Sequence, residues 1–417
     1  MWTGGRAFLG THQLWKLRVA VATVFVKGET HMSTYAIKAD TFFMPTGPVS
    51  GGYLLVEDGV FGAHVAEEPS CQIVDLTGKQ IAPGFVDTHI HGFDGCDIMD
   101  GTTESVATVS RGLLRNGVTS YLPTTLTATV EQLEQACASV AAYVEQADET
   151  AHARIEGIFL EGPFFTEKFK GAQNPAYLSA PSLEALKRWQ DAAHGLVKKI
   201  AVAAEYPETP AFIRGAREMG VVVALGHSNA TARQALDCLN AGASVFVHTY
   251  NGMSPLHHRE PGMVGAALYS AERSYSEIIC DGHHVNPIAA GIVMNAKGHD
   301  HTALITDCMC AGGMPDGEYK LGELPVVVKD GTARLTDSGS LAGSILRMNN
   351  AVKNVVDWGI ASQAEAVYMA TQAPAEANEI DDVCGSIRAG RNADFVVLDH
   401  ALNLEATYLG GEQVYTA

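Results

Sequence analysis

Eight short apolar runs divide the middle of this sequence, and each of them ends in a polar side chain. Amphipathic helical patterns lie between most of the runs, for example over residues 103–116 and 130–145. Alternating strands and helices favour parallel strands. Eight such strands over roughly 290 residues predict an α/β fold of the (β/α)8 TIM-barrel type rather than an open sheet. The runs are Ile81–His91, Val118–Thr124, Ile155–Glu161, Ile200–Glu205, Val221–His227, Ser244–His248, Ile278–Asp281 and Ala303–Asp307.

Both ends of the chain have the pattern of short strands joined by tight turns. Asp58-Gly59 and Gly410-Gly411 each stand between two alternating apolar segments, which is typical of β-hairpins. Residues 33–80 and 376–417 therefore predict a small β-sandwich domain built from both termini. The barrel, over residues 81–375, would be the metal-dependent catalytic domain.

Two segments stand outside this pattern. Gly317–Thr336 alternates around Asp330-Gly331, which predicts a β-hairpin inserted after the eighth run. Residues 1–32 contain the apolar run Leu17–Val26, which is far too short to span a bilayer. No small-residue cleavage site follows it cleanly. We treat residues 1–32 as an N-terminal extension of unknown status, and Met32 is an alternative start.

The composition excludes several classes of protein. With 28 Lys and Arg against 47 Asp and Glu, the net charge is −19, which argues against binding of nucleic acid or of an anionic membrane. Apolar residues make up 47% of the chain, as expected for a globular protein with a large core. The eight cysteines form no CxxC pair, and we expect free thiols in a cytoplasmic enzyme.

Metal-binding side chains fall at the ends of the predicted strands. His89 and His91 share one face of an extended strand, because residues i and i+2 point the same way. The carboxyl ends of barrel strands converge at one mouth. Ligands of this kind suit one divalent ion, with Zn²⁺ or Fe²⁺ preferred, and leave room for a second. The other candidate ligands are Glu161, His227 and His248.

Asp307, at the end of the eighth run, is the candidate general base. A divalent metal lowers the pKa of a bound water, and a nearby carboxylate can take that proton and pass it to a leaving group. The alternatives for Asp307 are a structural aspartate or a simple metal ligand. A single histidine at a strand end is more often structural than functional, so the joint pattern is what points to a metal site.

The motifs resemble those of the N-acetylglucosamine-6-phosphate deacetylases, a branch of the amidohydrolase superfamily. The resemblance covers about residues 34–417 and implies hydrolysis of the N-acetyl group of N-acetylglucosamine 6-phosphate. The products would be glucosamine 6-phosphate and acetate, in amino-sugar catabolism and recycling. The motifs occur in order and are Pro83–Gly92, Leu160–Phe164, Gly226–Thr231, His248–Met253, Arg259–Gly262, Asp281–Val285, Ile305–Asp307 and Leu341–Ser344.

The resemblance also implies roles for single residues. Glu161, His227 and His248 would hold the principal metal, and Asp307 would be the catalytic aspartate. The fourth run has no lysine at its end, which counts against relatives that use a carboxylated lysine. The family is usually a homodimer in which an arginine loop reaches the neighbouring site. The residues at the family's sugar-phosphate contacts are Ala172, Asn251, Gly252, Arg259, His284, Leu341, Ala342 and Gly343.

A sugar phosphate needs a cationic grip in so acidic a protein. Arg259 can contact a phosphate through two N–H groups, and His284 can add a hydrogen bond. Gln173 stands where some members of the family have histidine, and its amide can donate to the acetyl carbonyl but cannot act as an acid. We therefore expect a second metal on His89 and His91, bridged by Glu161, to take over carbonyl polarisation.

Two alternatives to this function remain open from the sequence. Another amidohydrolase, such as a deacetylase of a different amino sugar, a cyclic-amide hydrolase or a deaminase, would use the same metal ligands. The pair of Arg259 and His284 separates these alternatives from the proposed function, because they need no grip on a phosphate. A non-catalytic homologue acting as a binding protein would have lost ligands, whereas this chain has the full set. The gluco, galacto and manno epimers are not separable from sequence.

Overall fold

The computed structural model describes residues 34–147 and 152–417, so the predicted extension over residues 1–32 lies outside the described residues. Its largest sheet has nine strands. Without the two-residue strand β10 (Arg154–Ile155), eight parallel strands remain, in agreement with the predicted barrel. They are β6 (Phe85–Ile90), β9 (Val118–Thr125), β11 (Ile158–Glu161), β12 (Val197–Val202), β13 (Val222–Leu225), β14 (Val245–Phe246), β15 (Tyr275–Ile279) and β16 (Thr302–Ile305).

The barrel closes between its first and last strands. The backbone N–H of Asp307, just after β16, donates to the carbonyl of His89 on β6 over 2.9 Å. A parallel bridge pairs Ile90 with Cys308. Closure brings the ends of β6 and β16 together, although more than 200 residues of chain separate them. The predicted ligands at these two ends therefore become neighbours.

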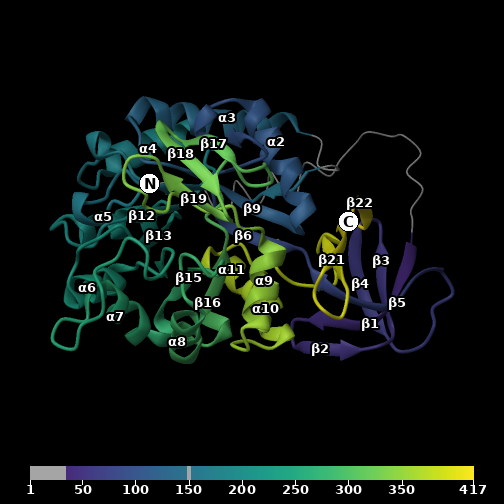
Figure 1. Ribbon diagram of the computed structural model, residues 1–417. Coiled ribbons are helices and arrows are strands. Elements are labelled where there is room, and N and C mark those ends of the chain that lie inside the picture. The colour runs from purple at the N-terminus through teal and green to yellow at the C-terminus, as the bar shows by residue number, and fades with distance from the viewer. Residues whose placement is uncertain (1–33, 148–151) are drawn as a thin grey trace, which may run out of the picture. The chain divides into compact units, whose positions relative to one another are not determined.

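Each barrel strand is followed by a helix, and Figure 1 shows these helices around the strands. Local capping explains where several of them begin. Thr129 and Thr231 each form a capping box with the glutamine three residues later, which satisfies free backbone N–H groups at the helix start. The helices are α2 (Thr103–Leu113), α3 (Val130–Gln146), α4 (Leu183–Ala192), α5 (Thr209–Glu218), α6 (Ala232–Ala241), α7 (Gly262–Tyr269), α8 (Pro287–Lys297), α9 (Met348–Asp357), α10 (Gln363–Met369) and α11 (Gln372–Ala377).

The amino-terminal end of the barrel is filled with apolar side chains. Val86, Phe159 and Val222 belong to one buried cluster with Ala375 and Ala377 of α11. In this way α11 covers the amino-terminal end of the barrel. The backbone N–H of Val86 also donates to the carbonyl of Ala370, which stands just before α11 in the chain, over 2.9 Å. The apolar floor leaves the opposite, carboxyl-terminal mouth for polar residues.

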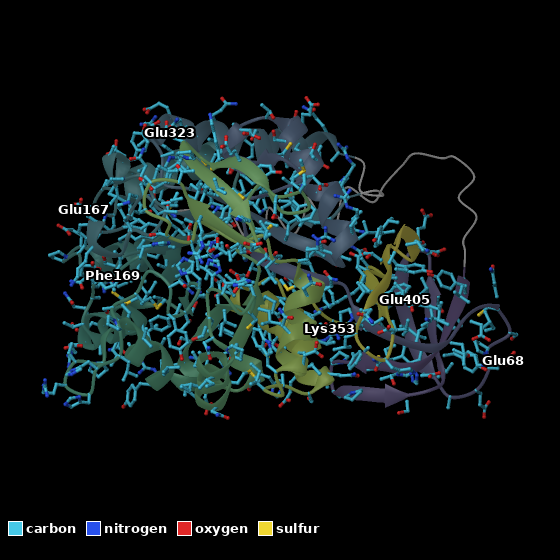
Figure 2. All side chains as sticks on the ribbon, in the orientation of Figure 1. Glu68, Glu167, Phe169, Glu323, Lys353 and Glu405 are labelled. Carbon is cyan, nitrogen blue, oxygen red and sulfur yellow. The ribbon has the colours of Figure 1, made fainter. Side chains whose placement is uncertain are left out.

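Strands from both termini form a second sheet, as predicted. Figure 1 shows the purple strands from the start of the described chain beside the yellow strands from its C-terminal end. Glu405 on β21, labelled in Figure 2, accepts a hydrogen bond from Lys79 on β5 and so joins the two ends of the chain. The strands are β1 (Thr34–Met44), β2 (Gly47–Ser50), β3 (Tyr53–Glu57), β4 (Val60–Val65), β5 (Gln72–Pro83), β20 (Phe395–Leu398), β21 (Leu404–Leu409) and β22 (Glu412–Thr416).

This terminal sheet curls over its own core. Three strands separate β4 from β20 in the hydrogen-bonded order. Nevertheless, the rings of Phe61 on β4 and Phe395 on β20 lie 6.3 Å apart, and the N–H of Phe61 donates to the carbonyl of Arg391. The sheet therefore encloses apolar side chains between facing strands, as expected for a sandwich.

Two smaller features complete the fold. The segment predicted as a hairpin is a three-stranded antiparallel meander of β17 (Gly317–Leu321), β18 (Leu324–Lys329) and β19 (Thr332–Leu335). A short antiparallel pair joins β7 (Gly92–Phe93) to β8 (Cys96–Asp97). Within the described residues, no helix combines the length and the apolar character needed to cross a membrane.

Candidate metal centre

Six side chains with metal-binding atoms meet at the carboxyl ends of the barrel strands. Each lies within two residues of the end of its strand, and all are buried. They form two groups, and the ligand atoms within each group lie within 4.8 Å of one another. The first group is Glu161, His227 and His248, and the second is His89, His91 and Asp307. The structure thus brings together all six residues that the sequence placed at this mouth.

The first group centres on one carboxylate oxygen. Glu161 Oε1 lies 3.2 Å from His227 Nε2 and 3.1 Å from His248 Nε2. The two Nε2 atoms are 3.0 Å apart. His227 Nδ1 lies 3.0 Å from the carbonyl of Phe169, and His248 Nδ1 lies 3.1 Å from the carbonyl of Asn251. Since a carbonyl only accepts, Nδ1 carries the proton in each neutral ring and Nε2 presents a lone pair.

These lone pairs decide whether a cation fits the first group. Two imidazole lone pairs and a carboxylate oxygen face one another without a donor between them, which is unfavourable in a buried site. A divalent cation among the three atoms relieves this repulsion, and imidazole with carboxylate is a donor set suited to zinc and iron. The backbone carbonyls that hold each Nδ1–H act as the outer partners that ligating histidines need. The residues present therefore fit a metal.

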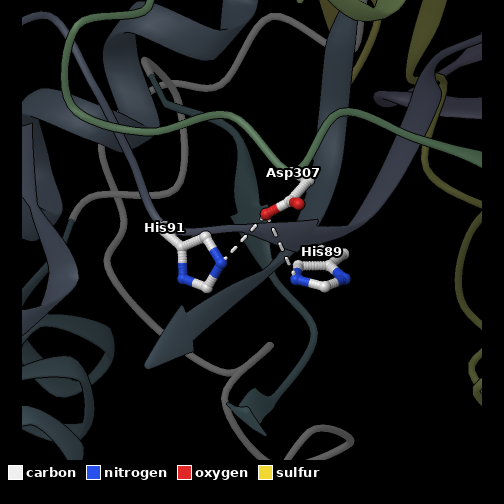
Figure 3. A group of neighbouring side chains, drawn as sticks. All are labelled: His89, His91 and Asp307. Atoms are coloured by element: carbon white, nitrogen blue, oxygen red, sulfur yellow. Dashed lines mark ion pairs between the residues drawn. The ribbon is translucent and has the colours of Figure 1, made fainter. Parts of the chain in front are cut away.

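The second group lies beside Glu161 of the first. Asp307 Oδ1 lies 3.1 Å from His91 Nε2 and 3.5 Å from His89 Nε2, and Figure 3 shows both rings turned toward this carboxylate. Glu161 Oε1 is 3.3 Å from His89 Nε2, and its Oε2 is 3.5 Å from His91 Nε2. One carboxylate thus stands between the two groups, as a bridging ligand would.

The electrostatics of the second group favour positive charge. Burial alone would lower the pKa of His89, but the carboxylates of Asp307 and Glu161 outweigh it and raise the pKa to about 10. Burial likewise opposes ionisation of Glu161, yet the positive charge of His89 holds its pKa well below the usual value. Without a metal the carboxylates would thus keep a proton on His89, so the centre takes up either protons or a cation.

The backbone is strained where it presents these ligands. His227, His248 and Asp307 have φ angles of 45°, 29° and 49°, in the left-handed region. Non-glycine residues rarely adopt this region, and such strain gathers at functional sites. Gly252 allows close approach, because an added Cβ would lie 2.9 Å from His227 Nδ1.

Gln173 is held against a metal-site carboxylate. Its Nε2 donates to Glu161 Oε2 over 2.6 Å, and its Oε1 accepts from the N–H of Thr127 over 2.8 Å. Glu323, at the turn between β17 and β18 (Figure 2), accepts from Asn174 Nδ2 over 3.0 Å and so holds the same loop. Ala172 and Gln173 line a cavity of about 400 Å³ beneath this turn. The second N–H of the Gln173 amide has no partner among the described residues.

The other predicted contact residues divide into two sets. Asn251 and Gly252 adjoin the first metal group, because the Asn251 carbonyl accepts from His248. The segment Leu341–Gly343 leads to Ser344, whose N–H donates to the carbonyl of Asp307 over 2.7 Å. Ala342 of this segment is buried.

Among the described residues, neither Arg259 nor His284 forms a hydrogen bond or ion pair with a proposed metal ligand. Arg259 is exposed, and its Nη1 lies 2.9 Å from His258 Nε2. His284 Nδ1 lies 2.6 Å from Asp281 Oδ2, which leaves Nε2 for another partner. The proposed phosphate grip therefore stays a prediction for the single chain.

Sequence reasoning missed two charged residues inside the barrel. Lys199 on β12 and Glu277 on β15 are fully buried, and Lys199 Nζ donates to Glu277 Oε1. Burial by itself would raise the pKa of Glu277, but Lys199 and His89 hold it below the usual value. The fourth strand does carry a lysine, yet its ammonium is committed to Glu277. Lys199 and Glu277 stand directly before the predicted runs Ile200–Glu205 and Ile278–Asp281, so the sequence placed neither of them inside a strand.

Known proteins resemble the chain over most of its length. The amidohydrolase family model matches residues 81–414. An N-acetylglucosamine-6-phosphate deacetylase from Vibrio furnissii is 41% identical over 82% of this chain and 85% of its own length. An N-acetylgalactosamine-6-phosphate deacetylase from Escherichia coli O157:H7 is 36% identical over 91% of this chain and 99% of its own.

A solved structure extends the likeness to three dimensions. It is an N-acetyl-D-glucosamine-6-phosphate deacetylase variant from Mycobacterium smegmatis in complex with N-acetyl-D-glucosamine-6-phosphate. It matches with a TM-score of 0.86 and 34% identity, over 92% of this chain and 100% of that chain. The match spans the barrel and the strands from both termini. The chain therefore belongs to the amidohydrolase family, within the branch of the N-acetylhexosamine-6-phosphate deacetylases.

Proposed function

We propose that this chain hydrolyses the N-acetyl amide of N-acetylglucosamine 6-phosphate to glucosamine 6-phosphate and acetate. The observation that carries the proposal is the pair of metal-binding groups at the mouth of the barrel, with Glu161 of one group beside His89 of the other and Asp307 beside His91. The relatives supply the substrate class, since those at 41% and 36% identity are deacetylases of N-acetylhexosamine 6-phosphates.

Glu161, His227 and His248 would hold the principal metal, and His89 and His91 would hold a second ion with Glu161 as the bridge. The native ion is proposed to be Zn²⁺ or Fe²⁺, which suit nitrogen and oxygen ligands. A bound divalent ion supplies a more acidic water and a polarised acyl carbonyl.

Asp307 would move the proton of the reaction. Burial disfavours its charged form, but the His89 and His91 side chains hold its pKa below the usual value, so the carboxylate is ionised near neutral pH. It accepts a proton from the attacking water as the hydroxide oxygen bonds to the acetyl carbon. It then returns this proton to the amide nitrogen as the C–N bond breaks. The free N–H of Gln173 would help to orient the acetyl group.

The sugar phosphate would be held by the residues that the family resemblance indicates. Asn251, Gly252, Ala172 and the segment 341–343 lie near the metal ligands and would contact the sugar. Because Arg259 is exposed, we propose that it reaches the phosphate in the site of a second copy of the chain. Such a homodimer with shared active sites would also cover Tyr269, Ile288 and Ile292, exposed apolar side chains at the end of α7 and on α8.

Two further proposals concern the setting of the enzyme. All eight cysteines are free thiols, which supports a reducing, cytoplasmic compartment. We also propose that residues 33–80 and 376–417 form a domain separate from the barrel over residues 81–375. The strand β5 (Gln72–Pro83) then crosses the boundary and connects them covalently.

The deciding experiment is acetate release from N-acetylglucosamine 6-phosphate, before and after chelation. Two substrates run beside it, the same sugar without phosphate and the galacto epimer of the sugar phosphate. The galacto epimer is the second candidate, because a relative that acts on it is 36% identical. Chelator-sensitive release, with preference for the phosphorylated gluco sugar, supports the proposal. Preference for the galacto epimer shifts the substrate, and no release from any sugar refutes the proposed reaction.

A further inference from the structure

A buried ion pair lies in the barrel interior beneath the second metal-binding group. Lys199 on β12 and Glu277 on β15 are both fully buried. Glu277 Oε1 accepts from Lys199, and it lies 3.4 Å from Thr88 Oγ1. Its other oxygen, Oε2, faces His89 Nδ1 at an ion-pair distance of 3.5 Å, and neither atom has a hydrogen-bond partner among the described residues. The carboxylate therefore stands between the lysine and a proposed metal ligand.

Stability alone does not explain this pair. Taking two charges out of water costs more than their attraction returns in many proteins, and apolar residues of similar volume often serve as well. Inward-facing positions of barrel strands are usually branched apolar side chains. A carboxylate and an ammonium in such positions point to a task that apolar residues cannot perform.

The geometry around His89 indicates that task. The ring has Glu277 on its Nδ1 side, and Asp307 and Glu161 on its Nε2 side. A carboxylate that faces Nδ1 favours the proton on that nitrogen, so that Nε2 offers its lone pair to the metal group. Phe159 packs edge-on against the ring, with centroids 4.9 Å apart at 88°, and Lys199 Nζ lies 3.9 Å from the centroid of the same Phe159 ring.

We propose that Glu277 and Lys199 are positioning residues for the metal at His89. Glu277 holds the ring in the tautomer and orientation that present Nε2, and Lys199 neutralises Glu277 so that a carboxylate can stand there. The inference rests on the proposed metal-dependent function and adds to it two residues that position a metal ligand without binding the metal. It also explains why Lys199 is not itself a metal-bridging residue, since its ammonium is committed.

The test compares three variants with the wild type. Glu277→Gln removes the charge at nearly constant shape, Lys199→Met leaves Glu277 without its partner, and the double variant contains a neutral pair. Glu156→Gln is the matched control, because Glu156 is a shielded carboxylate that accepts from Ser120 over 3.1 Å and has no part in the metal groups. Metal-free protein is titrated with Zn²⁺ against a competing chelator, and Tm is measured in parallel.

We expect two Zn²⁺ ions per wild-type chain. In Glu277→Gln and in the double variant, the first ion should bind as in the wild type and the second about 10- to 100-fold more weakly. The double variant should nevertheless be more stable than Lys199→Met, because it has no uncompensated charge. The control should keep both affinities.

Three results would overturn the proposal. Wild-type affinity for both ions in Glu277→Gln removes the positioning role. If the double variant recovers both the affinity for the second Zn²⁺ ion and the Tm of the wild type, the ion pair is merely structural. A wild type that saturates with one ion leaves His89 without the metal that the proposal requires. The proposed reaction is judged separately, by acetate release from the wild type, so failure of one does not count as failure of the other.

Discussion

Replacement of Asp307 by asparagine separates a proton-transfer role from a structural one. Asparagine keeps an oxygen that can face His91 and His89, whose Nε2 atoms lie 3.1 Å and 3.5 Å from Asp307 Oδ1. It also tolerates the left-handed φ of 49° at this position better than most residues. Alanine would add about 1 kcal/mol of backbone strain. Asp307→Asn should therefore fold like the wild type and bind metal.

The expected loss of turnover follows from the lost base. A positioned general base contributes about 10²- to 10⁴-fold to the rate, which corresponds to roughly 3 to 5.5 kcal/mol of activation free energy. Asparagine has no basic oxygen near neutral pH, so the whole of this contribution should disappear. KM should change little, because Asp307 is proposed to act on the water rather than on the sugar.

Acetate release is measured together with metal content and Tm. A fall of at least 100-fold in kcat, with wild-type metal content and Tm, supports the assignment. Turnover within a few-fold of the wild type would reject Asp307 as the base. If metal content falls in proportion to turnover, Asp307 is a simple ligand, the alternative that the sequence left open.

Three other variants or treatments test the remaining assignments. Arg259→Ala should raise KM for the phosphorylated sugar about 10- to 100-fold, the value of one or two charged hydrogen bonds, and an equal loss on the unphosphorylated sugar would contradict a phosphate contact. Zn²⁺ uptake by protein from which the metal has been removed should release a proton at neutral pH, because the pKa of His89 without metal is about 10. Calorimetry in two buffers with different ionisation enthalpies measures this proton release, and the variant His89→Gln should not show it. Burial raises the pKa of Glu156 to about 7, so the wild type loses stability as pH rises from about 4.5 through 7. Glu156→Gln should therefore be more stable at pH 8, by at most about 3 kcal/mol, and equally stable at pH 4; a Tm difference that does not vary with pH would refute this.

The barrel was predictable because its signal is local and repeated. Each strand is a short apolar run with a polar end, and helical patterns, several of them with a capping residue, lie between the runs. Sequence alone therefore located all eight strands. The ligands followed from topology, since parallel strands of a barrel end at one mouth. The three-stranded form of the meander was missed, because a third strand at residues 332–335 depends on pairing with β18 rather than on its own pattern.

The residues around the ligands were less predictable. Gln173 was expected to face the substrate, and its amide contacts Glu161, the last residue of β11, from the loop that follows this strand. Arg259 was expected in a phosphate site, and it lies exposed; no pattern in one chain shows what a second copy contributes. The domain boundary at residue 80 stays a prediction, since β5 runs through it.

Lys199 and Glu277 show why a charged interior escapes sequence reasoning. Each one alone, next to an apolar run, predicts an edge position or a strand end, because burying a lone charge is very costly. The cost falls only when the two meet, and they lie 78 residues apart on strands that do not pair directly. Their meeting depends on barrel closure, which also brings His89 beside Asp307. The closure that assembles the metal ligands thus also assembles the charges beneath them. A mutation of the ion pair should therefore affect the metal ligands, and a mutation of a ligand should affect the ion pair.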